Sequence, residues 1–134
     1  PNHMLGSMFG KRGYNILKKM GVTGVVSMRE TVPYPAYDIK TLHLPTKDKK
    51  APMINDLWKG VDFINKIQHS GGKAYVHCRA GKGRGPTMVI AYLISKGMTL
   101  EEAIDKVKKV RRFINPTSQQ LETLKRFESN QSKS

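Results

Sequence analysis

The sequence is poor in cysteine, and this shortage restricts what the protein can be. Cys78 is the single cysteine among 134 residues, so the chain cannot form an internal disulfide. A secreted scaffold held together by disulfides is therefore excluded, and a reducing intracellular compartment, cytoplasmic or organellar, is the simpler expectation. The one thiol is free to react.

Long apolar stretches are missing as well. No run approaches the roughly 20 apolar residues that cross a bilayer, and Pro1–Met4 does not open a secretory signal. We expect a protein that is not secreted and has no transmembrane segment, although a targeting segment removed beforehand would leave no trace. Residues 1–3 are interpreted as a cloning remnant.

Acidic residues are scarce too: 10 Asp and Glu stand against 24 Lys and Arg, a formal net charge of +14. This excess favours polyanionic partners such as phosphate esters, anionic membranes or nucleic acid. It does not choose among them, because a single lysine more often solvates a helix face than binds a ligand. The choice has to come from a site.

The length of the chain suffices for one domain. A chain of 134 residues supports one hydrophobic core, and no repeat or linker divides it. We expect a single domain over 1–134, a frayed polar tail at 129–134, and a monomer.

Helical and strand patterns alternate along the chain. Helices are predicted to end at Gly21, to cover Ile54–Ile67, and to cover Met88–Lys96 with Pro86 as a first helical residue and Gly97 closing the helix. Two more are predicted to begin at the capping boxes Thr99/Glu102 and Thr117/Gln120. Strands are predicted at Val22–Met28, Ile39–Leu44 and Ala74–Val76. The crossover between the last two strands through a helix predicts parallel pairing.

The segment after the last predicted strand carries the strongest chemical signal. It reads HCRAGKGR over residues 77–84, with five residues between Cys78 and Arg84. A loop entering a helix N-terminus can direct backbone N–H groups at phosphoryl oxygens, and Gly81 and Gly83 permit the curvature. The same groups stabilise a thiolate and can lower a cysteine pKa from about 8.5 to roughly 3.5–7.5. Cys78 is therefore the candidate nucleophile.

Arg84 supplies what a phosphoryl group requires next. A planar guanidinium binds two phosphoryl oxygens at once and stabilises the transition state, which a lysine does less well. The alternative is a buried structural thiol beside a surface arginine. It is disfavoured because buried cysteines rarely lie in so cationic and glycine-rich a segment.

This segment resembles the HCx5R loop of the protein tyrosine and dual-specificity phosphatase superfamily. Further segments follow the order of the compact dual-specificity type: Leu5–Ser7, Gly24–Met28, the loop around Asp48, and Pro116–Phe127. The resemblance implies an α/β fold with a central, mainly parallel sheet flanked by helices. It also implies hydrolysis through a phosphocysteine without a metal or another cofactor. The overall sequence is most similar to phosphatidylglycerophosphate phosphatases of the mitochondrial type and their small relatives.

Members of the family take a general acid from a loop upstream of the cysteine, and Asp48 matches this position. The chemistry also requires such a group, because an alkyl leaving oxygen needs a proton and the water that attacks the phosphocysteine needs a base. A solvated aspartate in a lysine-rich turn is the alternative. Asp38 is the reserve candidate, whereas Asp56 and Asp62 fall inside a predicted helix and are poorer ones.

Supporting roles are expected for the rest of the site. By its family position His77 adjusts the surroundings of the cysteine, with a satisfied strand-end histidine as the alternative. Gln120 resembles a polar family position near the phosphoenzyme, but helix capping explains it equally well. Where the family usually has Ser or Thr after the arginine, this chain has Gly85, which puts turnover in doubt; Thr87 stands at a different spacing. The predicted phosphate-binding loop comprises His77, Arg79, Ala80, Gly81, Lys82, Gly83 and Gly85.

Basic residues indicate the substrate class. Arg79 and Lys82 resemble the loops of lipid phosphatases, and Lys47 and Lys49 add positive potential beside Asp48. We expect a phosphomonoester hydrolase for an anionic lipid or small polyanionic phosphate, such as phosphatidylglycerophosphate or a phosphoinositide, with peripheral contact to an anionic membrane. A dual-specificity protein phosphatase is the first alternative. An RNA 5′-phosphatase or a phosphate-binding pseudophosphatase is the second, and nucleic acid is the less favoured partner.

Overall fold

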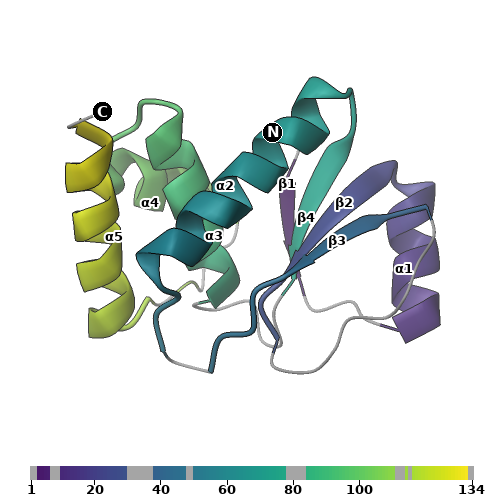
Figure 1. Cartoon of the computed structure of the whole chain (residues 1–134), viewed down its shortest axis with the longest axis horizontal. Coiled ribbons are helices and arrows are strands. Elements are labelled where there is room, and N and C mark those ends of the chain that lie inside the picture. Colours follow the sequence, from purple (N-terminus) through teal and green to yellow (C-terminus); the bar gives the residue numbers. More distant parts are fainter. Residues whose placement is uncertain are drawn as a thin grey trace.

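The computed structural model describes residues 3–6, 10–29, 38–47, 50–77, 84–110, 114 and 116–132. The elements are β1 His3–Gly6, α1 Gly10–Lys19, β2 Val22–Ser27, β3 Lys40–His43, α2 Ile54–His69, β4 Lys73–His77, α3 Arg84–Ser95, α4 Leu100–Val110 and α5 Ser118–Ser132. In the first part of the described chain four strands are interspersed with helices α1 and α2, and the helices α3, α4 and α5 follow one another at its end (Figure 1).

The four strands form one sheet in the order β1-β4-β2-β3, and every neighbouring pair is parallel. The last strand in the sequence, β4, therefore lies between β1 and β2. In the register of these pairs His77 lies beside Gly6 and Ser27, and Ser27 lies beside His43. All four carboxyl ends share one edge of the sheet, where open α/β sheets bind their ligands. The predicted α/β fold with a parallel sheet is confirmed.

Side chains alternate between the two faces of the sheet, as strand geometry requires. Val25 and Tyr75 belong to a small buried cluster with Tyr14 and Leu17 of α1. Their neighbours Val26 and Val76 belong to the large core, which continues through α2 and α3 to α4 and α5. Figure 1 shows α1 alone on one side of the sheet and α5 outermost on the other. Helices thus pack on both faces of the sheet whose carboxyl edge is expected to bind the ligand.

Local signals for helix ends are confirmed. Gly21 and Gly97 have φ angles of 85° and 108°, a left-handed conformation that favours glycine and stops the preceding helix. Both capping boxes form, with Thr99 N–H donating to Glu102 at 2.9 Å and Thr117 N–H donating to Gln120 at 2.9 Å. Among the described residues, no helix is both long and apolar enough to cross a membrane.

Three local features differ from the prediction. Strand β1, which includes His3, was not predicted. Helix α3 begins at Arg84, two residues before Pro86. The tail is helical to Ser132 rather than frayed from residue 129, and the Glu128 carboxylate accepts a hydrogen bond from Leu100 N–H at 2.6 Å. That bond, together with the packing of α5 on the core, orders a segment whose polar composition indicated fraying.

Candidate active site

Backbone hydrogen bonds continue past the carboxyl ends of the strands. Met28 N–H donates to the His77 carbonyl at 2.7 Å, and Leu44 N–H donates to the Ser27 carbonyl at 2.8 Å. Thr46 N–H in turn donates to the Met28 carbonyl at 3.2 Å. The chain that leaves β3 is thereby held against the end of β2, which is itself bonded to β4. Segments distant in sequence meet at the point where the HCRAGKGR loop begins.

Arg84 is a buried cation at this edge. Its residue is only 5% exposed, and its Nη1 donates to the Thr46 carbonyl at 2.8 Å and to the Met28 carbonyl at 3.4 Å. Burying a guanidinium is costly unless its N–H groups are paired. These carbonyl partners satisfy donors without neutralising the positive charge. The N-terminus of α3 adds its own positive potential, so the described part of the site is suited to bind an anion.

His77 is the last residue of β4 and is 2% exposed. Its ring lies against Tyr75, with ring centroids 6.1 Å apart and planes at 28°. Because side chains two apart in a strand share a face, His77 lies on the α1 side of the sheet. Its predicted influence on the cysteine remains a prediction.

Several predicted site residues lie outside the described residues. The structure gives both ends of the predicted phosphate-binding loop, His77 at the end of β4 and Arg84 at the start of α3. The assignments of the residues between them, and of two residues in the lysine-rich turn, remain predictions. These residues are Cys78, Arg79, Ala80, Gly81, Lys82, Gly83, Asp48 and Lys49.

The described alternatives to Asp48 lie elsewhere. Asp38 precedes β3 at the amino edge of the sheet and pairs with Lys18, so its reserve candidacy was wrong. Asp56 and Asp62 lie in α2, as predicted, within 3.9 Å of Lys59 and 3.1 Å of Lys66, respectively.

Gln120 is a described neighbour of the lysine-rich turn that sequence reasoning left undecided. It is 0% exposed, and its Nε2 donates to the Lys50 carbonyl at 3.1 Å while its Oε1 serves the capping box. Gln120 shares the buried face of α5 with Leu124 and Phe127, four and seven residues later. The sequence did contain a signal for this residue, because Gln120 is polar at a position where the helical pattern of Leu124 and Phe127 predicts an apolar side chain.

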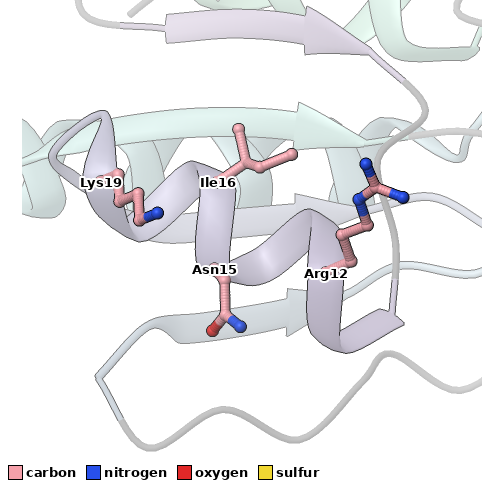
Figure 2. A pocket seen from close by; sticks show the side chains of 4 residues that line it. All are labelled: Arg12, Asn15, Ile16 and Lys19. Atoms are coloured by element: carbon pink, nitrogen blue, oxygen red, sulfur yellow. The ribbon is translucent and has the colours of Figure 1, made fainter.

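A hollow lies along α1. Figure 2 shows the side chains that line it, Arg12, Asn15, Ile16 and Lys19, which follow one stripe of the helix. None of these four is a nucleophile or an acid of the kind that hydrolysis requires. This hollow therefore does not compete with the carboxyl edge as a catalytic site.

A family model described as "Dual specificity phosphatase, catalytic domain" matches residues 5–130. The chain belongs to this family. It is 39% identical over 117 residues to phosphatidylglycerophosphate phosphatase PTPMT2 of Arabidopsis thaliana, covering 81% of this chain and 51% of the relative. It is 32% identical over 130 residues to human dual specificity protein phosphatase 1, covering 93% of this chain and 35% of the relative. The chain thus spans about half or less of these relatives' lengths.

A solved structure agrees with this assignment. The crystal structure of PTPMT1 in complex with PI(5)P superimposes with a TM-score of 0.89 at 32% identity, covering 99% of this chain and 94% of that one.

Gly85 stands where the resemblance to the phosphatase loop predicts Ser or Thr. Gly85 and Thr87 are both buried in the first turn of α3, directly after Arg84. The position that lacks a hydroxyl, residue 85, is therefore in the same helical turn as the Arg84 guanidinium. Whether it slows the second chemical step remains a prediction.

Proposed function

We propose that this domain hydrolyses phosphate monoesters through a phosphocysteine on Cys78. The observation that carries the proposal is the buried guanidinium of Arg84, held by two carbonyls at the start of the helix that follows the HCRAGKGR loop. A fixed cation in a site shielded from water stabilises charge on a transferring phosphoryl group without having to reorganise. Family membership supports the same chemistry.

The proposed reaction has two displacements. The Cys78 thiolate attacks phosphorus, the S–P bond forms, and the ester O–P bond breaks while Asp48 gives a proton to the leaving oxygen. Asp48, now a carboxylate, takes a proton from water, which attacks phosphorus and releases phosphate and the thiolate. Arg84 binds phosphoryl oxygens in both steps.

We propose an anionic lipid or a small polyanionic phosphate, such as phosphatidylglycerophosphate or a phosphoinositide, as substrate. The similarity to a phosphatidylglycerophosphate phosphatase and to a PTPMT1 structure holding PI(5)P supports this class. The exposed Lys47 and Lys50 add positive charge beside the predicted general acid. A substrate with a second anionic group gains from such a surface, and peripheral contact with an anionic membrane would present it.

Protein phosphatase activity on phosphotyrosine and phosphoserine or phosphothreonine is the second candidate. It is favoured by the similarity to dual specificity protein phosphatase 1, which extends over nearly the whole of this chain.

A substrate panel tests the proposal. Phosphatidylglycerophosphate, PI(5)P, phosphotyrosyl and phosphothreonyl peptides and 5′-triphosphorylated RNA are compared by kcat/KM, with Cys78→Ser as the control that should release no phosphate. We expect the highest kcat/KM for the lipids. Preference for peptides would support the second candidate, and phosphate-analogue binding without any turnover would replace both with a binding domain.

A further inference from the structure

The segment that joins β3 to α2 is held at two points by buried polar side chains. Arg84 donates to the Thr46 carbonyl at 2.8 Å, and Gln120 donates to the Lys50 carbonyl at 3.1 Å. A turn bond from Lys50 N–H to the Lys47 carbonyl at 3.0 Å lies between them. Residues 47–49, which include the predicted general acid, stand between the two points of attachment.

The amide of Gln120 has a defined orientation. Its Oε1 accepts the Thr117 N–H at 2.9 Å, so its Nε2 is the end directed at Lys50, and the side chain is fully buried. A buried amide bonded at both ends loses rotational freedom and becomes a rigid support.

The helix that carries Gln120 is itself firmly packed. Leu124 and Phe127 of α5 are fully buried, and the Phe127 ring lies 4.5 Å from the Trp58 ring between centroids. A groove lies between Lys50 and Ala51 on one side and α5 on the other, and the buried Gln120 bond joins the two elements that form it. An outer helix, far from the sheet in Figure 1, thus reaches the segment beside the active site.

We infer that Gln120 is a positioning residue that acts on proton transfer through the Lys50 carbonyl. The inference rests on the proposed function and on Asp48 as the general acid. Asp48 lies outside the described residues, but the described contacts restrain the chain on both sides of it. Proton transfer requires a heavy-atom distance near 3 Å, so a shift of the segment weakens it. Attack by the thiolate does not depend on that distance.

Two Gln120 variants remove the donor, and the first of them keeps the acceptor for Thr117 N–H. Gln120→Glu keeps an acceptor for Thr117 N–H, since glutamate is a usual residue at this capping position, but an ionised carboxylate cannot donate to the Lys50 carbonyl. Gln120→Met removes the donor without adding a charge, and it keeps the test available if the glutamate variant fails to fold. The matched control is Thr117→Ala, which removes the Thr117 hydroxyl cap and keeps the Gln120 donor.

The readout is the ratio of kcat/KM for an alkyl phosphate to kcat/KM for para-nitrophenyl phosphate. This ratio reports the first displacement, in which only the alkoxide needs a proton to leave. We expect both Gln120 variants to lower the ratio by roughly 10–10²-fold, the effect of displacing a catalytic group by about 1 Å. Thr117→Ala should lower the melting temperature and leave the ratio unchanged. A merely structural role would lower both rates together.

A double-mutant cycle tests whether the effect passes through Asp48. In the Asp48→Ala background, Gln120→Met should not lower the ratio further, because the group it positions is absent. If the unmodified protein is active and the Gln120 variants keep its ratio, or if the two effects add, the inference is overturned alone. If the unmodified protein hydrolyses neither ester, the proposed function fails and the inference fails with it.

Discussion

The two edges of the sheet carry charged residues in opposite surroundings. At the carboxyl edge, Arg84 is 5% exposed and bonded to backbone carbonyls. At the amino edge, Lys18 pairs with Asp38 through side chains that are 61% and 64% exposed, and Lys73 donates to the Met20 carbonyl from an exposed position. Both edges are basic in sequence, so basicity does not distinguish them.

Burial is what separates the edges. Exposed ion pairs are weakened by solvent and salt and contribute little to stability or binding. A buried cation acts through a medium of lower dielectric and keeps its direction. The comparison predicts that substitutions at the carboxyl edge change activity strongly and that substitutions at the amino edge change it little.

The largest expected effect is that of Arg84→Ala. Loss of an arginine that stabilises a transferring phosphoryl group should lower kcat for para-nitrophenyl phosphate by roughly 10³–10⁵-fold. Lys73→Ala, which removes a cation of the amino edge, should leave kcat near the unmodified value. Comparable losses in the two variants, measured on folded protein, would contradict the contrast between the edges.

The next effect separates two aspartates. Asp48→Ala should slow the first step for alkyl phosphates by roughly 10²–10⁴-fold and for aryl phosphates with good leaving groups less, because only an alkoxide needs a proton to leave. Asp38→Ala should change neither rate, since Asp38 lies at the other edge. An equal, small effect of Asp48→Ala on both ester types would make Asp48 a solvated turn residue.

The substrate preference can be tested by paired charge removals. Arg79→Ala with Lys82→Ala should lower kcat/KM for phosphatidylglycerophosphate by roughly 10–10²-fold, because charge-assisted contacts contribute about 1.5–3 kcal/mol each in favourable cases. The value for para-nitrophenyl phosphate should change modestly. Lys19→Ala with Lys40→Ala removes the same charge at the amino edge and should affect neither substrate. Proportional losses on both substrates in the first variant would mean that its residues support the loop.

A smaller effect is expected within the carboxyl edge at Gly85. The unmodified protein should show a burst of leaving group before a slower steady state, and Gly85→Ser should raise the steady rate by supplying a hydroxyl that assists departure of the thiolate. Stopped-flow measurement with para-nitrophenyl phosphate resolves both phases. No burst, and no gain in the variant, would remove this interpretation of Gly85.

The smallest effect concerns stability. Asp38→Asn removes an exposed ion pair and should change the free energy of unfolding by less than about 1 kcal/mol in urea titrations. Added salt should reduce that difference further. A larger loss would mean that the Lys18–Asp38 pair stabilises the fold more than an exposed ion pair does.

Much of the secondary structure was predictable because its signals are local. The glycines at 21 and 97 and the two capping boxes act within one helical turn, and each was confirmed. Strand β1 was missed because four residues are too few for an alternating pattern, and its pairing with β4 makes it a strand. The helical tail was missed because Phe127 packs into the core and Glu128 bonds to Leu100, contacts that polar composition does not reveal.

The sequence by itself determined which class of chemistry to propose, because a candidate nucleophile, a predicted anion-binding loop and a guanidinium are consecutive in one segment. Only the tertiary structure decided which distant parts of the chain meet beside the two described ends of that segment. Arg84 reaches carbonyls 38 and 56 residues away, and Gln120 reaches one 70 residues away. Every residue has a carbonyl, so the sequence carries no mark of which ones will be used. Parallel pairing of the strands and packing of α5 select them by bringing the chain ends of the site together.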